Sequence, residues 1–283
     1  MTHTEFSWVT KQGTKVYAQK WLPEGEVKAT INLVHGMGEH STRYAHVAEF
    51  LTKKGYAVYT FDQLGHGRTL GKKGHTPSYD ALLDNIDVLL AKSKEEYPKL
   101  PQVLYGHSMG GNLVLYYGLK RKPNIKGVMA TSPWLKLAFE PPTIQLTVGK
   151  IVRNLMPAFV QSTKLNTKHI SRDLQEVKKY EQDSLNHDKI STTFFFGVHE
   201  AGLWTLEHAS EWTLPLYLTH GTGDQITSYK ASEEFASKAK DKTTLKLWPD
   251  MYHETHNEIG KQEVLQTMGN WLDKLLVEKP VTV

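Results

Sequence analysis

Short apolar runs alternate along the chain with longer stretches in which apolar residues recur every three or four positions. Runs such as Tyr56–Phe61 and Gly127–Thr131 have the length of buried strands. Residues 80–97 place apolar side chains at positions 82, 83, 86, 89 and 90, on one face of a helix. Strands that alternate with helices predict a mostly parallel, doubly wound sheet covered by helices on both faces.

The same pattern gives approximate bounds for the other elements. Strands are predicted at 6–10, 15–22, 29–35, 56–61, 103–105, 127–131, 216–219 and 245–248. Helices are predicted at 44–54, 80–97, 111–120, 229–239 and 263–277. Gly13 separates the first two strands and suits a tight turn, so we expect an antiparallel hairpin at one edge of the sheet.

The alternation stops between about 134 and 205. This stretch contains two adjacent prolines and shows no clear rhythm of strands and helices. Within it, residues 144–156 carry apolar side chains on one helical face, which ends before Pro157 because proline interrupts a helix. We therefore expect a helical cap over 134–205, inserted into a core that consists of 1–133 and 206–283.

Composition narrows the class of protein. Of 283 residues, 39% are hydrophobic and 23% are charged, which is enough apolar surface for a sizeable core and excludes a disordered chain. The absence of cysteine excludes disulfides, thiolate metal sites and cysteine nucleophiles. No apolar run is long enough to span a bilayer, and the first residues do not resemble a signal peptide, so we expect a cytoplasmic protein.

The net charge of +4 is spread over the chain, and the longest basic runs are pairs of lysines. Nucleic-acid binding is therefore not expected, because it requires a clustered basic surface. A weak attraction to anionic membrane surfaces or acidic substrates is the remaining consequence of the charge.

A G-x-S-x-G pattern is formed by Gly106, Ser108 and Gly110. A predicted strand precedes it and a predicted helix follows it, which is the context of a nucleophile elbow. Side chains at the flanking positions would clash in so tight a turn, and the serine hydroxyl is presented on a strained backbone. We therefore predict Ser108 as a catalytic nucleophile and not as a bystander in a glycine-rich turn.

A serine hydroxyl needs a histidine base that is oriented by an acid. In a chain with a nucleophile elbow, the acid and then the histidine follow the serine in sequence. Asp224 follows the predicted strand 216–219, and His253 follows the strand 245–248. We expect Asp224 to be the acid and His253 to be the base.

Two neighbours of His253 compete for these roles. Asp250 lies three residues before it and would have to fold back to reach the imidazole. His256 is better suited to line the pocket or to begin the next helix. A metal site on the two histidines is disfavoured, because no third ligand is evident nearby.

The oxyanion of an acyl-transfer reaction requires two backbone N–H donors. One is expected at Met109, directly after the nucleophile. The other is expected at Met37, in the loop that follows the strand 29–35. Both contribute through the backbone, so the side chains at these positions carry no information about the role.

Three segments carry a resemblance to a known family. They are HGMGEHSTRY at 35–44, FDQLGHGR at 61–68 and GHSMGG at 106–111. In combination they resemble the α/β-hydrolase superfamily and, within it, the monoacylglycerol lipase and lysophospholipase branch. The resemblance implies that Glu39, Arg43 and His256 shape the polar end of the substrate pocket. From the residues alone, Glu39 and Arg43 are equally compatible with a surface ion pair four positions apart.

The resemblance implies a serine hydrolase without a cofactor or metal that cleaves esters of single acyl chains, monoacylglycerols first among them. Lysophospholipids and short-chain carboxylic esters are alternative substrates for the same residues. A peptidase, a thioesterase, a cofactor-free haloperoxidase and a non-catalytic ligand-binding protein share the fold. The apolar face of 144–156 is expected to pack on the core; its alternatives are to line an acyl tunnel or to touch a membrane transiently.

Overall fold

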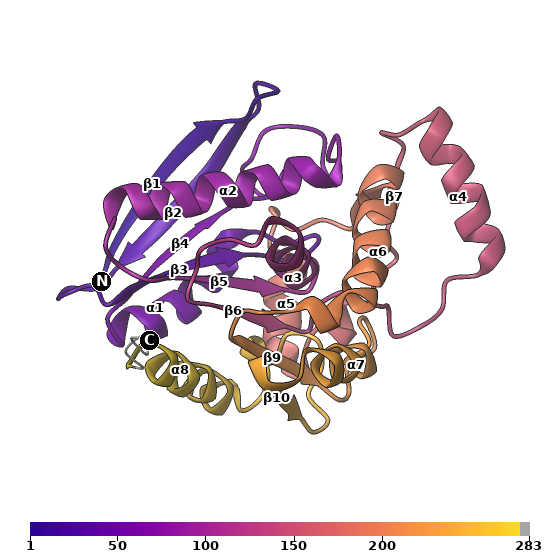
Figure 1. Cartoon of the computed structure of the whole chain (residues 1–283). Coiled ribbons are helices and arrows are strands. Elements are labelled where there is room, and N and C mark those ends of the chain that lie inside the picture. Colours follow the sequence, from indigo (N-terminus) through magenta and orange to yellow (C-terminus); the bar gives the residue numbers. More distant parts are fainter. Residues whose placement is uncertain (278–283) are drawn as a thin grey trace.

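A computed structural model describes residues 1–277 of the chain. Its central strands are β1 (Thr2–Val9), β2 (Lys15–Leu22), β3 (Ala29–Val34), β4 (Tyr56–Phe61), β5 (Gln102–His107), β6 (Gly127–Thr131), β9 (Leu216–Gly221) and β10 (Thr243–Trp248). They form one sheet in the order β1–β2–β4–β3–β5–β6–β9–β10 (Figure 1). The hairpin β1–β2 is antiparallel and joins β4 antiparallel, and all other neighbours are parallel.

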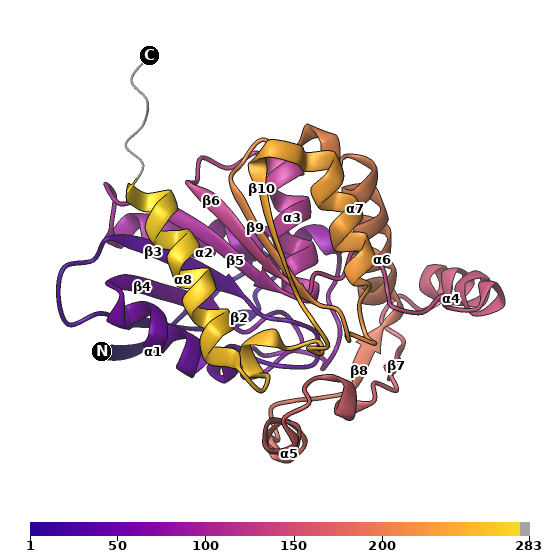
Figure 2. The same ribbon diagram turned by 90° about the horizontal axis from the view of Figure 1, so that it is seen from below.

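Helices cover both faces of this sheet (Figures 1 and 2). One face carries α1 (Ala45–Lys53) and α8 (Lys261–Val277), whose buried side chains form one core with β3 and β4. The other face carries α2 (Tyr79–Glu96), α3 (Met109–Arg121) and α7 (Tyr229–Ala239), which pack into a second core. The prediction of a mostly parallel, doubly wound α/β sheet is therefore confirmed.

Burial of the sheet between two layers of helices explains which strands could be predicted from the sequence. All six residues of β4 are buried, so this strand is a continuous apolar run, and its bounds are those predicted. β1 begins four residues earlier than predicted, at Thr2, and most of it is exposed. Its polar residues give no apolar signal, and the strand is defined instead by its pairing with β2.

The segment between β6 and β9 carries several elements on the carboxyl side of the sheet. They are α4 (Thr143–Leu155), β7 (Val160–Ser162), η2 (Thr167–His169), α5 (Leu174–Gln182), β8 (Lys189–Ser191) and α6 (Thr192–Glu207). Asn112 of α3 donates to the carbonyls of Trp134 and Val198, which ties α6 to the helix behind the nucleophile. We keep 134–205 as the proposed extent of the cap.

The helix α4 stands out from the body of the molecule in both views (Figures 1 and 2). None of its residues is buried, and Ile144 and Leu155 are 78% and 77% exposed. Its links to α6 include the stacking of Arg153 on Phe196. The expectation that its apolar face packs on the core is wrong. Within 1–277, no helix combines the length and apolar character needed to cross a membrane.

Candidate active site

The turn between β5 and α3 holds Ser108 in a strained backbone conformation, with φ 55° and ψ −115°. Its N–H donates to the Thr131 carbonyl at 2.9 Å, which fixes the turn to β6. A Cβ at Gly106 would lie 2.2 Å from the Gly110 carbonyl oxygen, and one at Gly110 would lie 2.0 Å from that of Val34. Glycine is therefore required at both flanking positions, as the G-x-S-x-G pattern predicts.

Three side chains from separate strand ends meet at this turn. His253, after β10, places Nε2 2.8 Å from Ser108 Oγ. Its Nδ1 lies 2.7 Å from Oδ2 of Asp224, in the loop after β9. All three residues are buried. The carboxyl ends of parallel strands lie along one edge of the sheet, so residues 145 and 29 positions apart form one continuous chain of hydrogen bonds.

Asp224 is held by more than the candidate base. Its Oδ1 accepts the backbone N–H groups of Ile226 and Thr227, at 2.7 and 3.1 Å. Its Oδ2 is shared between His253 and the buried His220, whose Nε2 lies 2.9 Å away. Burial opposes ionisation of the carboxyl, but the two imidazoles outweigh it and hold the pKa of Asp224 well below its usual range.

The electrostatics of His253 follow from the same contacts. Burial by itself lowers the pKa of the imidazole, whereas the charge and the hydrogen bond of Asp224 favour the protonated form. Together with the charges of Glu254 and Glu39, these contacts outweigh burial, so the pKa of His253 is raised above 6.5. A raised proton affinity strengthens a general base, because it makes proton transfer from a serine hydroxyl less unfavourable.

The competing residues of the sequence interpretation lie elsewhere. Asp250 is exposed, and its backbone N–H donates to Thr222 Oγ1. His256 begins no long helix but lies in η5 (Thr255–Asn257), buried and stacked on the Tyr44 ring at 5.0 Å. Burial lowers the pKa of His256 to about 3, so it is neutral at physiological pH. Among residues 1–277, no cluster of three or more potential ligands could hold a metal ion.

The candidate oxyanion loop lies directly after β3, opposite the elbow. Met37 lines the same cavity as Ser108, and its Sδ lies 3.3 Å from His66 Nε2. Met109 is the first residue of α3, and the first N–H groups of a helix have no partner within the helix. The two predicted backbone donors therefore belong to the loop after β3, for Met37, and to the first turn of α3, for Met109, and their role stays a prediction.

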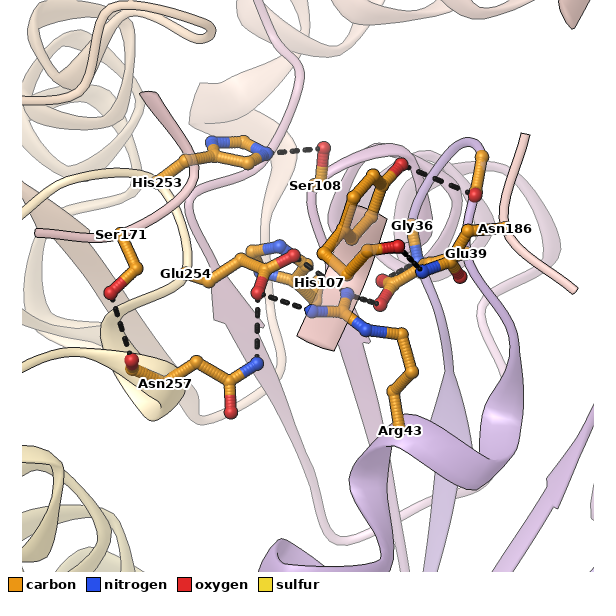
Figure 3. A network of polar contacts seen from close by, with 12 residues as sticks. Gly36, Glu39, Arg43, His107, Ser108, Ser171, Asn186, His253, Glu254 and Asn257 are labelled. Atoms are coloured by element: carbon orange, nitrogen blue, oxygen red, sulfur yellow. Dashed lines mark hydrogen bonds and ion pairs between the residues drawn. The ribbon is translucent and has the colours of Figure 1, made fainter. Parts of the chain in front are cut away.

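A buried ionic cluster lies beneath this loop (Figure 3). Arg43 donates to Glu39 at 2.6 Å and, through both terminal nitrogens, to Glu254 at 2.7 Å. The Glu39–Arg43 pair is thus buried and not a surface pair. Glu39 lines the cavity, whereas Arg43 and His256 lie behind its wall, and their predicted role in the pocket stays a prediction.

Sequence reasoning did not identify His220 or Glu254. Both are close in sequence to the candidate acid and base, at four residues before Asp224 and one after His253. Glu254 would have indicated a buried ion pair only if its partner Arg43, 211 residues away in the sequence, had been known.

A cavity of about 1020 Å³ opens over Ser108 between the sheet and the cap. Apolar residues of the cap line it: Leu137, Phe139, Ile144, Val148, Phe195 and Phe196. Polar side chains also line the cavity: Gln161, Asn166, Asn186, His187 and Asp188. The cavity therefore offers both apolar and polar contacts to a ligand whose reactive group lies near the serine.

Comparisons with known proteins agree over nearly the whole chain. A family model described as "serine aminopeptidase, S33" matches residues 25–260. The chain is 28% identical to a monoacylglycerol lipase of Mycolicibacterium smegmatis over 96% of its own length and 97% of that protein. A solved structure of Paleococcus ferrophilus monoacylglycerol lipase is similar, with a TM-score of 0.84, 32% identity and coverage of 92% and 99%.

A further relative is longer. An abhydrolase domain-containing protein of Dictyostelium discoideum, described as uncharacterized, is 35% identical over 96% of the chain. The chain spans only 29% of that relative's length. The comparison therefore concerns one portion of the Dictyostelium protein.

Proposed function

The chain belongs to the serine aminopeptidase, S33, family of α/β-hydrolases and is a serine ester hydrolase, and from this premise we propose that it cleaves monoacylglycerols. We assign Ser108 as nucleophile, His253 as base and Asp224 as orienting acid. The observation that carries the proposal is the hydrogen-bonded chain of these three residues at the base of a partly apolar cavity. Relatives that are monoacylglycerol lipases support the choice of substrate.

The reaction proceeds by acyl transfer in two steps. Ser108 Oγ attacks the ester carbonyl carbon while its proton passes to His253 Nε2, and the Met37 and Met109 amides stabilise the oxyanion. The intermediate collapses, the glycerol oxygen takes the proton from Nε2, and an acyl-serine remains. Water then attacks the acyl carbonyl carbon while its proton passes to His253 Nε2; the bond to Ser108 Oγ breaks, Oγ takes that proton back, and the fatty acid leaves.

Release of glycerol from monoacylglycerols of graded chain length tests this proposal. The same assay includes lysophosphatidylcholine, a p-nitrophenyl acetate and an aminoacyl arylamide, which represent the alternative substrates. We expect the highest kcat/KM on a long-chain monoacylglycerol. A phospholipase of Bacillus subtilis, 26% identical, makes the lysophospholipid the second candidate. If folded protein releases no glycerol from any chain length, the monoacylglycerol assignment is wrong.

The pH dependence of activity follows from the state of His253. His253 must be neutral to act as a base, and its pKa is raised above 6.5. As the pH falls, protonation of His253 therefore inactivates the enzyme at a higher pH than that at which a free histidine titrates. We expect kcat/KM to fall about tenfold per pH unit below that pKa. Measuring the profile from pH 4.5 to 9 checks this. A flat profile down to pH 4.5 would contradict histidine base catalysis.

We also propose that the exposed apolar face of α4 touches membrane surfaces where acyl substrates reside. Apolar residues on a helix face that meets no core favour insertion at a lipid interface. The double substitution Ile151→Asp and Leu155→Asp should lower co-flotation with anionic liposomes severalfold. Leu70→Asp, at a core loop where leucine is 64% exposed, is the matched control. Equal flotation of both variants and wild type would exclude contact through α4.

A further inference from the structure

The residue that follows the candidate base is a buried carboxylate. The side chain of Glu254 is 4% exposed, and both of its oxygens accept hydrogen bonds from Arg43 at 2.7 Å. Asn257 donates to Oε2 at 2.8 Å. The two-pronged contact with the guanidinium fixes both distance and orientation, which a single ammonium group does not. The loop that carries His253 is therefore clamped one residue beyond the imidazole (Figure 3).

The same guanidinium reaches the opposite side of the site. Arg43 donates to Oε2 of Glu39 at 2.6 Å. The other oxygen, Oε1, accepts the Gly36 N–H at 2.6 Å and the Tyr44 hydroxyl at 2.7 Å. Gly36 directly precedes Met37, so Glu39 fixes the backbone from which the proposed oxyanion donor extends.

A third contact holds this loop from the side of the cap. The guanidinium of Arg43 lies over the ring of Tyr180, 4.8 Å from its centroid. The Tyr180 hydroxyl donates to the Gly38 carbonyl at 3.2 Å. Arg43 thus contacts three parts of the site. These are Glu254 in the loop that carries His253 (the base loop), Glu39 in the loop that carries Met37 (the oxyanion loop), and Tyr180 in α5.

We propose that Glu254 is a positioning residue, which through Arg43 and Glu39 sets the base loop and the oxyanion loop at a fixed distance from each other. The proposal rests on the assigned roles of His253 and Met37. Burying three charged groups is costly, and apolar residues would join two loops as firmly. A cluster of two carboxylates and one guanidinium does something that apolar packing does not, because it leaves a net negative charge beside the base.

The charged and titratable groups around the His253 imidazole decide the sign of this effect. They are Asp224, Glu254, Glu39, Arg43, His107 and His256, and the cap contributes the His169 carbonyl, which accepts the His253 N–H. Burial lowers the pKa of His107 and of His256, so both are neutral. Burial raises the pKa of Glu254, but the charge and hydrogen bonds of Arg43 outweigh burial and lower this pKa to about 2. The carboxylate is therefore ionised over the whole pH range in which the enzyme works. Glu254 therefore favours the imidazolium that forms when Ser108 loses its proton.

Glu254→Gln tests both the positioning of the two loops and the effect of the negative charge on His253, since it keeps the size of the side chain and removes its charge. We expect kcat on a p-nitrophenyl ester to fall about 10- to 100-fold, because small displacements of reacting groups have effects of this size. We also expect the acidic limb of the kcat/KM profile to move to lower pH by about one unit, because a nearby negative charge that favoured the imidazolium is gone.

Two further variants separate positioning from stability. Glu258→Gln removes another buried carboxylate of the same loop, which pairs with Arg172 and accepts the Tyr252 N–H. We expect Glu258→Gln to lower the midpoint of thermal unfolding as Glu254→Gln does. The acidic limb of its kcat/KM profile should stay at the pH of wild type. Arg43→Lys retains the positive charge and loses the two-pronged contact, so kcat should fall while the limb stays in place. Arg43→Lys also carries the test if Glu254→Gln does not fold.

The outcomes distinguish this inference from the proposed function. Wild-type protein that neither hydrolyses esters nor reacts with a fluorophosphonate would overturn the function itself. Active wild type, with Glu254→Gln at the same kcat and the same acidic limb, would show that Glu254 is only a structural charge. Equal shifts of the limb in the Glu254 and Glu258 variants would also overturn it.

Discussion

Replacement of Ser108 by alanine is expected to lower ester turnover by about 10⁵- to 10⁶-fold, the range known for loss of a serine nucleophile in subtilisin. The substitution removes the oxygen that lies 2.8 Å from His253 Nε2 and leaves the base without a proton to accept. The oxyanion donors and the cavity remain, so a small residual rate from binding alone persists. Single-turnover and steady-state assays with the same monoacylglycerol measure the loss.

The control for this variant is Ser184→Ala, at an exposed serine of the cap. It should keep wild-type turnover and fluorophosphonate labelling, whereas Ser108→Ala should lose both at an unchanged thermal midpoint. A Ser108→Ala protein that still forms a covalent adduct would place the nucleophile at another residue.

Asp224→Asn is expected to lower kcat by about 10⁴-fold, the effect of the equivalent change in a serine protease. An amide in place of the carboxylate can donate to Nδ1, which would hold the imidazole in the wrong tautomer for accepting the serine proton. It also removes the charge that raises the pKa of His253, so the acidic limb should move to lower pH in this variant.

Asp250→Asn is the matched control, because Asp250 is the alternative candidate for the acid, three residues before His253 in the sequence. Its side chain is exposed, and substitutions at such positions change stability little, so we expect kcat within about twofold of wild type. If Asp250→Asn lowered kcat more than Asp224→Asn, the assignment of the acid would be wrong. Both variants are compared at the pH optimum of each, which separates a change in rate from a change in titration.

The fold was predictable where burial imposes a simple pattern. β4 and β6 are buried throughout and occur at the predicted bounds. α6 was missed because its buried residues include Phe194, Phe196 and Val198, at a spacing of two, together with residues on other sides, so no single helical stripe is visible. α5 was missed for the opposite reason, since it is short and mostly polar.

The candidate site was predictable where local backbone geometry restricts the residue type. Ser108 could be proposed because an elbow requires glycine at 106 and 110, and Asp224 and His253 because loops after successive strands meet at one edge. The ionic cluster could not, because its geometry depends on Arg43 and Glu254 meeting across 211 residues. Nothing local to either residue distinguishes a buried bridge from a solvated charge.

The order of the strands has a consequence for protein synthesis. The nucleophile precedes the base by 145 residues, and the strands that carry the acid and base lie beyond the whole cap. At about 5–20 residues per second, a ribosome needs roughly 7 to 29 s to add those residues. During that interval the growing polypeptide contains a serine elbow without its base. On the proposed assignment, we expect ester hydrolysis to begin only after His253, which follows β10, has been translated and β10 has paired with β9.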